Sequence, residues 1–292
     1  MGTQPEAGIR ARDWAIRAIT WKPARHVLKT GAHLYAAQRG HLLERRGRLP
    51  EIANIYTASA QKAGSQWMRA LFDHPIIRHH TGLFTVPQMD YLQRPGIALP
   101  LATFVPGLYV DYATYQKLPH SYPHRVIYMF RDPRDLVVSG YFSAVKTHQN
   151  THVDEVESLR DELRALPFDE ALLRVIEVAA PVLRDVETWV DVSDPNVAFF
   201  KLEEVQADPA TNVARMLDHC EIHLSEAEFE QVLNETSREA LQAKDLARRE
   251  PGAESHYRVD RKGFRELFKA EHYAALEAVA PGLTERLGYP PA

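Results

Sequence analysis

The chain has 292 residues, of which 45% are hydrophobic, and carries a formal net charge of −4. That length suits one sizeable α/β core, although two domains would also fit, and the weakly acidic balance gives no sign of bulk nucleic-acid binding. The single cysteine, Cys220, excludes a disulfide within the chain and suits a reducing compartment. No apolar run reaches the roughly 20 residues that cross a bilayer, and the first residues lack the apolar stretch of a signal peptide. We therefore expect a cytoplasmic protein.

The first fifty residues are unusually basic. Between Arg10 and Arg48 the sequence has ten Lys or Arg but only two acidic residues, Asp13 and Glu44. Apolar residues interleave with these cations at roughly helical spacing: Trp14, Ile16, Ile19, Trp21, Val27, Leu28, Leu34 and Tyr35. The pattern predicts a basic amphipathic helical extension over residues 1–50, packed on a domain formed by residues 51–292. The alternative is peripheral contact with an anionic membrane surface, or a basic lip over an acidic substrate.

Beyond residue 50, strand and helix patterns alternate. Strands are expected at 52–58, 126–130 and 197–200, and helices at 65–72, 132–146, 154–165, 168–191, 209–220, 225–234 and 272–279. Residues 75–120 contain many Pro and Gly, which favours loops with short strands or helices. Alternating strands and helices predict an α/β fold in which helices flank a central parallel sheet.

The most informative segment joins the first strand to the first helix. The turn between them contains Lys62 and Gly64, and the helix begins with Ser65, Gln66 and Trp67. A helix N-terminus has unpaired N–H groups and a partial positive charge, so it binds phosphate or sulfate readily. Gly64 lets an anion approach the backbone closely, and Lys62 adds a full charge.

An ATP-binding P-loop is the competing interpretation of this turn. That motif needs Gly-x-x-x-x-Gly-Lys-Ser/Thr, with the lysine after the last glycine. Here Lys62 precedes Gly64 by two residues, and alanine stands at position 58. An ATP-dependent kinase is therefore disfavoured, and a purely structural glycine turn is the other alternative.

A second strand-to-helix junction follows about seventy residues later. The apolar stretch 126–130 ends at Arg131, and Asp-Pro-Arg-Asp-Leu-Val-Val-Ser139 follows. Together the two junctions resemble the nucleotide-binding signature of sulfotransferases that use 3′-phosphoadenosine-5′-phosphosulfate (PAPS). The family's Lys-Ser-Gly-Thr-Thr-Trp loop is similar to residues 62–67, and its Arg-Asn/Asp-Pro-Arg/Lys-Asp-x-x-x-Ser motif fits residues 131–139 throughout.

The resemblance implies a P-loop-like nucleotide-binding topology, PAPS as donor, the bisphosphate PAP as product, and no metal. It implies that Lys62 and the following helix N-terminus stabilise the charge that grows on the leaving 5′-phosphate, and that Arg131 and Ser139 contact the 3′-phosphate. Thr236 stands where the family has a Thr-Ser-Phe motif that holds adenine. Arg238 replaces the aromatic residue of that motif, and a guanidinium can also stack on a base.

A basic loop near the end of the chain resembles the family's Arg-x-Gly-x-x-Gly-x-Trp segment, which closes over the 3′-phosphate. In one register Arg258 pairs with Gly263, and in the other Arg261, Lys262 and Gly263 match an Arg-Lys-Gly triplet. Both registers place several cations beside a glycine, which suits a doubly charged phosphate.

The group that deprotonates the acceptor is the least determined part of the site. The family commonly uses a histidine, but the corresponding stretch has Phe104, and counting back from Arg131 by the family's usual interval leads to Tyr109. We expect Asp111, the nearest carboxylate, to act as the base, although it could equally be the N-cap of a helix. The histidine alternatives are His79, His80, His120, His124 and His148.

These expectations combine into a sulfotransferase that moves a sulfuryl group from PAPS to a hydroxyl or amine. By analogy with the family, the acceptor is a small-molecule, carbohydrate or lipid-linked compound. Two alternatives stay open: a kinase-like phosphotransferase, and a non-catalytic protein that binds nucleotide or membrane.

Overall fold

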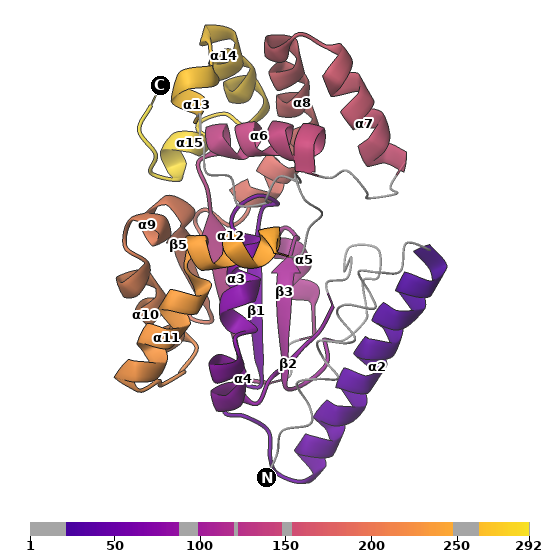
Figure 1. The fold of residues 1–292 in the computed structure, drawn as a ribbon, viewed down its shortest axis with the longest axis vertical. Helices are drawn as coiled ribbons and strands as arrows, with labels where there is room; N and C mark the ends of the chain where they lie inside the picture. The colour runs from indigo at the N-terminus through magenta and orange to yellow at the C-terminus, as the bar shows by residue number, and fades with distance from the viewer. Residues whose placement is uncertain (1–21, 88–98, 120–121, 148–153, 248–262, 292) are drawn as a thin grey trace.

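A five-stranded parallel sheet forms the centre of the computed structural model, which describes residues 22–87, 99–119, 122–147, 154–247 and 263–291. The strand order is β2-β3-β1-β4-β5, and every neighbouring pair is parallel. The strands are β1 (Asn54–Ser59), β2 (Phe84–Thr85), β3 (Thr103–Leu108), β4 (His124–Phe130) and β5 (Val197–Lys201). Helices surround this sheet in Figure 1, so the predicted fold class is confirmed.

The order of the strands indicates where a ligand binds. The chain passes from β1 to one side through β2 and β3, and then to the other side through β4 and β5. Every residue of β1 and β3 is buried, as expected for parallel strands between two helical layers. In such sheets a ligand binds beyond the carboxyl ends of the strands, at the point from which successive strands are added in opposite directions. Here that point lies beside β1.

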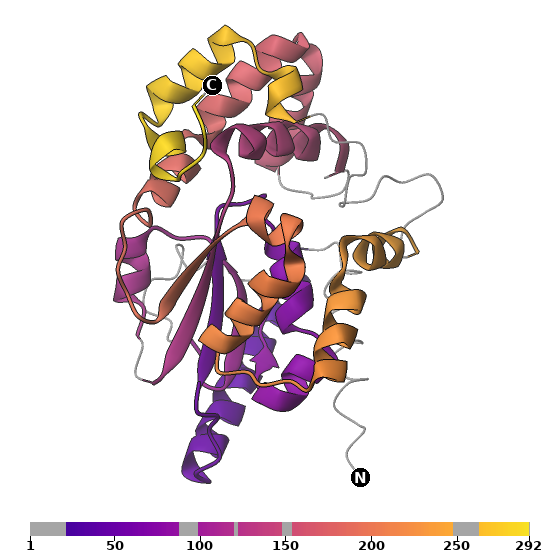
Figure 2. The same ribbon diagram turned by 90° about the vertical axis from the view of Figure 1, so that its left-hand side faces the viewer.

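Fifteen helical segments accompany the sheet in the described residues. They are α2 (Lys22–Arg45), α3 (Ser65–Phe72), α4 (Pro75–Thr81), α5 (Tyr112–Lys117), α6 (Pro133–Phe142), the π-helix η1 (Ser143–Thr147), α7 (Asp154–Ala165), α8 (Phe168–Glu187), α9 (Leu202–Ala207), α10 (Pro209–His219), α11 (Glu226–Thr236), α12 (Arg238–Leu246), α13 (Phe264–Leu267), α14 (Ala270–Val279) and α15 (Leu283–Arg286). Figure 2 shows α3, α10 and α11 on one side of the sheet, whereas α6, α8, α13 and α14 pack together beyond the carboxyl ends of the strands.

An aromatic cluster packs against the opposite face. The rings of Tyr115 on α5 and Tyr128 on β4 lie 5.2 and 4.5 Å from the ring of Trp189. The indole N–H of Trp189 donates to the carbonyl of Val110, at 2.9 Å. A buried indole needs such a partner, so this bond fixes the loop after β3 to the segment that follows α8.

Helix α2 lies beside the β2–β3 edge of the sheet (Figure 1). Its buried side includes His33 and the small residues Ala32, Ala36 and Gly40, and a Cβ atom on Gly40 would lie only 2.7 Å from the carbonyl oxygen of Leu101. Arg39 donates to the carbonyls of Gly82 and Ala102, at 2.6 and 3.1 Å. The helix is therefore docked on the domain, while residues 1–21 lie outside the described part.

Strand β3 differs most from the sequence-based expectation, because it lies within the segment expected to consist of loops and short elements. It contains Pro106, which has no N–H to donate, and Gly107, which has a φ of 68°. The β1–β3 register shifts between Tyr56 and Ala58, and the N–H of Gly107 donates to the Thr57 hydroxyl at 3.1 Å. A bulge thus accommodates the proline inside the sheet.

Candidate active site

The loop between β1 and α3 has a backbone that depends on glycine. Gly64 is the N-cap of α3, with a φ of 83°, and Lys62 is also left-handed, with a φ of 73°. A Cβ atom on Gly64 would lie 2.9 Å from the side chain of Leu202 on α9. No side chain caps α3, so its first N–H groups are available to an anion.

The Lys62 side chain extends from this loop to α6. Its ammonium group donates to the hydroxyl of Ser143, at 2.9 Å. Ser143 is buried and is the first residue of η1, which continues α6. Single π-helical turns often occur at functional sites, and no local sequence pattern indicated this one.

Arg131 joins the two predicted motifs. It follows β4 directly, and its guanidinium donates to the carbonyl of Lys62, at 2.7 Å. Its Nε is buried and has no hydrogen-bond partner. Burial lowers the pKa of Arg131, and the carboxylates of Asp135 and Glu203 act against that shift. A buried donor without a partner, beside a lysine and a helix N-terminus, suits an anionic ligand. Ser139 lies two turns along α6 and is half-buried.

The residues predicted to border the adenine lie where α3 meets the end of α11 and the start of α12. The indole N–H of Trp67 donates to the carbonyl of Thr236, at 3.1 Å, while the Thr236 hydroxyl donates to Val232 within α11. Arg238 opens α12 two residues later, and its Nη2 is buried without a partner. The hydroxyl of Ser59, the last residue of β1, is also buried and unpaired. Buried polar groups rarely go unpaired, so these atoms make this edge the candidate for a polar binding site.

Asp111 has a structural role at the end of the neighbouring strand. It is the N-cap of α5, and its two carboxylate oxygens accept hydrogen bonds from the N–H and the hydroxyl of Thr114, at 2.9 and 2.5 Å. Burial raises the pKa of Asp111, but the bonds from Thr114 outweigh it and leave the pKa below its usual value. Such a carboxylate is a weak base. The hydroxyl of Tyr109, by contrast, donates to the hydroxyl of Ser65, at 2.9 Å, and so lies at the start of α3.

The described histidines lie elsewhere. His124 begins β4, at the end of the sheet opposite the loop; it accepts from the Tyr115 hydroxyl and donates to the carbonyl of Tyr122, at 2.9 and 3.2 Å. His79 and His80 lie in the last turn of α4, where His80 is 3.0 Å from Glu228. The other candidate histidines, His120 and His148, lie outside the described residues.

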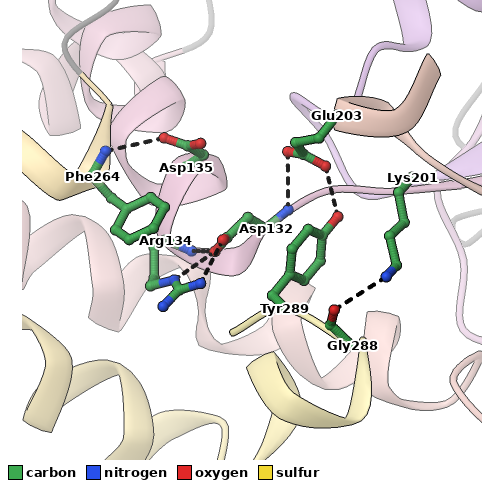
Figure 3. Close-up of polar contacts among 8 residues, drawn as sticks. All are labelled: Asp132, Arg134, Asp135, Lys201, Glu203, Phe264, Gly288 and Tyr289. Atoms are coloured by element: carbon green, nitrogen blue, oxygen red, sulfur yellow. Dashed lines mark hydrogen bonds and ion pairs between the residues drawn. The ribbon is translucent and has the colours of Figure 1, made fainter. Parts of the chain in front are cut away.

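The acidic and basic residues that follow Arg131 hold a distant part of the chain in place. Arg134 makes a bidentate contact with Asp132, at 2.9 and 2.7 Å, and its guanidinium lies 4.1 Å from the ring centre of Phe264. The N–H of Phe264 donates to Asp135, at 3.1 Å (Figure 3). Gly263 precedes this contact as the N-cap of α13. The remaining predicted loop residues, Arg258, Arg261 and Lys262, lie outside the described residues.

A second set of hydrogen bonds connects the last described residues of the chain to the strand ends of the sheet. Glu203 accepts the N–H of Asp132 and the hydroxyl of Tyr289, at 3.3 and 2.7 Å. Lys201 donates to the carbonyl of Gly288, at 3.3 Å (Figure 3). Residues 288 and 289 are therefore hydrogen-bonded to the end of β5 and the start of α9, and Glu203 links them to the segment that follows β4.

One group of potential metal ligands is explained by packing between helices. It consists of Asp169, Glu271 and His272. The N–H of Lys269 donates to Nδ1 of His272, at 2.9 Å, so the opposite nitrogen carries the proton and donates to the carbonyl of Asp169. The ammonium of Lys269 pairs with the Asp169 carboxylate. Both ring nitrogens are thus in use, and the group links α14 to α8.

Comparison with known proteins agrees with this geometry. A family model described as "Sulfotransferase domain" matches residues 53–273. The chain belongs to the sulfotransferase family. Cytosolic sulfotransferase 7 of Arabidopsis thaliana is 25% identical over 204 residues, which cover 62% of this chain and 60% of that protein. Human sulfotransferase 4A1 is 26% identical over 206 residues, covering 63% and 68%. The aligned region thus spans less than two thirds of the Arabidopsis protein.

Two solved structures share the fold at low sequence identity. Mouse sulfotransferase SULT7A1, complexed with PAP, aligns with a TM-score of 0.54 and 16% identity, over 83% of this chain and 91% of that one. A retinol dehydratase in complex with androsterone and PAP aligns with a TM-score of 0.51 and 15% identity, over 79% and 80%. In the described part of this chain, no helix has the length and apolarity needed to span a bilayer.

Proposed function

We propose that the protein transfers a sulfuryl group from PAPS to a hydroxyl or amine of a small-molecule, carbohydrate or lipid-linked acceptor in the cytoplasm. The contact between the two motifs carries this proposal: Arg131 binds the Lys62 carbonyl and keeps a buried, unpaired Nε beside the uncapped start of α3. Family membership and the PAP-bound relatives in the fold comparison support the choice of donor.

The residues present fit such a donor. Lys62, Gly64, Ser65 and Gln66 would surround the 5′-phosphosulfate side, since they combine a full charge with free N–H groups. Arg131 and Ser139 would bind the 3′-phosphate, together with the loop that contains Arg258, Arg261, Lys262 and Gly263. Trp67, Thr236 and Arg238 would border the adenine. The scheme needs no metal.

The chain's own contribution to the reaction is mainly electrostatic. Bound PAPS supplies an activated sulfuryl group, and its departure leaves negative charge on the 5′-phosphate. Lys62 and the uncapped N–H groups at the start of α3 would stabilise charge at that point. In a similar way, phosphoryl-transfer enzymes act mostly by positioning and charge stabilisation.

The acceptor's proton requires a further group. Asp111 was the expected base, yet its hydrogen bonds with Thr114 favour the N-cap role. Tyr109 is the other polar side chain after β3 and contacts Ser65 on α3. The retinol dehydratase of the fold comparison is in complex with androsterone, which is an alcohol, and with PAP, and this supports a hydroxyl acceptor here.

Thermal shift and group transfer together test the proposal. Purified protein is melted without ligand, with PAP, with ATP and with adenosine 5′-monophosphate; we expect PAP to raise the melting temperature most, because only PAP carries the 3′-phosphate. Transfer of ³⁵S from labelled PAPS to a panel of alcohols, amines and sugars then measures activity. A larger shift with ATP would support a kinase, and no shift with any nucleotide would refute the nucleotide site.

A further inference from the structure

Helix α2 presents its large apolar side chains to solvent. Six large hydrophobic residues are strongly exposed in the described part of the chain, and four of them lie on this one helix: Val27, Leu34, Tyr35 and Leu42. Their exposed fractions run from 47% to 67%. A soluble helix normally buries such residues and exposes polar ones, so this arrangement is inverted and needs an explanation.

The inversion is fixed by how α2 docks. Its inner side carries Ala32, Ala36 and Gly40, spaced four residues apart, which allow the helix to approach Leu101 closely. Arg39 anchors it to the carbonyls of Gly82 and Ala102. Rotating α2 to bury its larger residues would break these contacts, so the outward direction of the apolar side chains is part of the fold.

The exposed residues form one continuous stripe. Positions 27, 34, 35 and 42 follow the helical repeat and extend for about 22 Å along the axis. The ring of Tyr35 leans edge-on against Phe84 of β2, at 5.3 Å, and is still more than half exposed. A tyrosine with one apolar side and one hydrated side is typical of a boundary between hydrocarbon and water.

Three arginines lie next to the apolar stripe, at the carboxyl end of α2. Arg45, Arg46 and Arg48 are exposed and make no ion pair within the described ranges. Arg45 also lines a hollow of about 430 Å³ with Gln38, His41 and Leu42, so an apolar side chain and a cation meet there. Hydrogen bonds with Tyr122 and His41 lower the pKa of Glu44, so it stays ionised, but three arginines oppose this one carboxylate.

We propose that this stripe, Val27–Leu34–Tyr35–Leu42 with Arg45 and Arg46, is a membrane-binding surface that takes up the headgroup region of an anionic bilayer. Charge favours an anionic bilayer over the other surfaces that could cover this stripe. A second copy pairing through the same face would bring the arginines of the two copies together, whereas an anionic surface neutralises them.

Vesicle flotation with the full chain tests the proposal. We expect the protein to bind phosphatidylcholine vesicles that contain about 30 mol% phosphatidylglycerol at least tenfold more strongly than vesicles of phosphatidylcholine alone. Leu34→Gln/Leu42→Gln should lower the partition coefficient roughly 30-fold, because two apolar side chains no longer enter the interface. Arg45→Gln/Arg46→Gln should lower it roughly 20-fold on the anionic vesicles only.

The chain supplies its own matched control. Val178 and Leu246 are exposed apolar residues on α8 and α12, away from α2, so Val178→Gln/Leu246→Gln should bind vesicles as the wild type does. The shift of melting temperature with PAP should be the same for all variants, because none of these residues lies at the nucleotide site. That readout separates failure of the membrane proposal from failure of the proposed enzymatic function.

Four outcomes would overturn the proposal. The wild type could fail to float with anionic vesicles, or Leu34→Gln/Leu42→Gln could float equally well. The control variant could lose binding to the same extent, which would mean that exposed apolar residues anywhere on the surface contribute equally to vesicle binding. Finally, sedimentation velocity without lipid could show a dimer that Leu34→Gln/Leu42→Gln dissociates; the stripe would then be a subunit interface.

Discussion

The loops that follow β1 and β3 end at the same edge of the sheet, yet they use their polar groups in opposite ways. The loop after β1 leaves the first N–H groups of α3 uncapped and lies beside the unpaired Nε of Arg131. The loop after β3 closes on itself, since both oxygens of Asp111 are bound by Thr114 three residues later. The first loop thus leaves hydrogen-bonding groups unpaired for a ligand, whereas the second loop uses its carboxylate to cap α5.

This difference separates two kinds of site. The proposed nucleotide half depends on backbone conformation and a few charges, which a short motif encodes. The acceptor half depends on which side chains face a substrate, and its polar residue nearest to α3 is Tyr109 rather than the expected histidine or carboxylate. Variants in the two loops should therefore differ sharply in effect.

The largest effect is expected at Lys62. Lys62→Ala should lower turnover roughly 10²–10³-fold, equivalent to about 3–4 kcal/mol, because it removes a preorganised charge from the leaving group. Steady-state kinetics with labelled PAPS measures the loss. Lys117→Ala is the matched control, since Lys117 is an exposed lysine in the last turn of α5 and should have no effect. Retention of more than half the activity by Lys62→Ala would contradict the role assigned to it.

Arg131 is expected to distinguish nucleotides by their 3′-phosphate. Arg131→Ala should weaken PAP binding by about 1.5–3 kcal/mol, the contribution of a hydrogen bond to a charged group. Adenosine 5′-monophosphate, which lacks that phosphate, should lose little. Calorimetric titration of both ligands gives the answer, with Arg174→Ala as control because Arg174 lies on the exposed side of α8, paired with Glu162 and Glu177. Equal losses for the two ligands would exclude contact between Arg131 and the 3′-phosphate.

Arg238 offers a smaller test on the adenine side. Arg238→Ala should weaken PAP binding by about 1–2 kcal/mol, because its buried Nη2 lacks any partner in the described residues and is free to bind the ligand. Arg238→Phe restores a flat surface without a donor, so we expect it to bind as weakly as the alanine variant. Full recovery with phenylalanine would show instead that Arg238 acts by stacking.

The smallest effect on turnover is expected at Asp111, and it decides the comparison between the loops. A catalytic base would make Asp111→Asn lose 10²–10⁴-fold in rate. An N-cap would not, because asparagine caps helices equally well. From the contacts with Thr114 we expect the variant to stay within about threefold of wild type. A loss of 10²-fold or more, with PAP affinity unchanged, would restore Asp111 as the base.

The capping role has its own signature. Asp111→Ala should lower the free energy of unfolding by about 1 kcal/mol. Since the folded-state pKa of Asp111 is lowered, its stabilisation is fully present above the unfolded pKa of about 3.9 and is lost as pH falls towards the folded value. Chemical denaturation at pH 7 and pH 3 measures both effects; a difference between wild type and variant that grows on acidification would contradict this role.

Local signals predicted the parts of the fold that local physics controls. Strand β4, helix α3 and helix α7 agree with the sequence to within two residues, because their apolar periodicity and turn residues lie within the elements themselves. Strand β3 was not predicted as a member of the central sheet, since Pro106 and Gly107 normally interrupt strands. Its place depends on pairing with β1 through a bulge, a long-range contact that no short window shows.

The candidate site divides in the same way. The turn at Gly64 could be predicted because a glycine before an apolar helix is a local signal, and the structure gives that glycine a φ of 83°. Ser143 could not, because its contact with Lys62 joins residues 81 positions apart. The N-terminal extension was predicted as basic and helical, but the outward direction of its apolar residues follows from the docking of Gly40 against Leu101.

The contact between Phe264 and Asp135 also bears on how the protein becomes active during its synthesis. These residues are 129 positions apart, so α6, which contains Asp135, leaves the ribosome long before Phe264 is synthesised. At translation rates of 5–20 residues per second, roughly 6–26 s pass between the two. During that interval the growing chain has both proposed phosphate-binding motifs but lacks Phe264, whose ring lies against Arg134. Ligand binding by nascent chains should therefore begin abruptly, once residues near 264 have emerged from the exit tunnel.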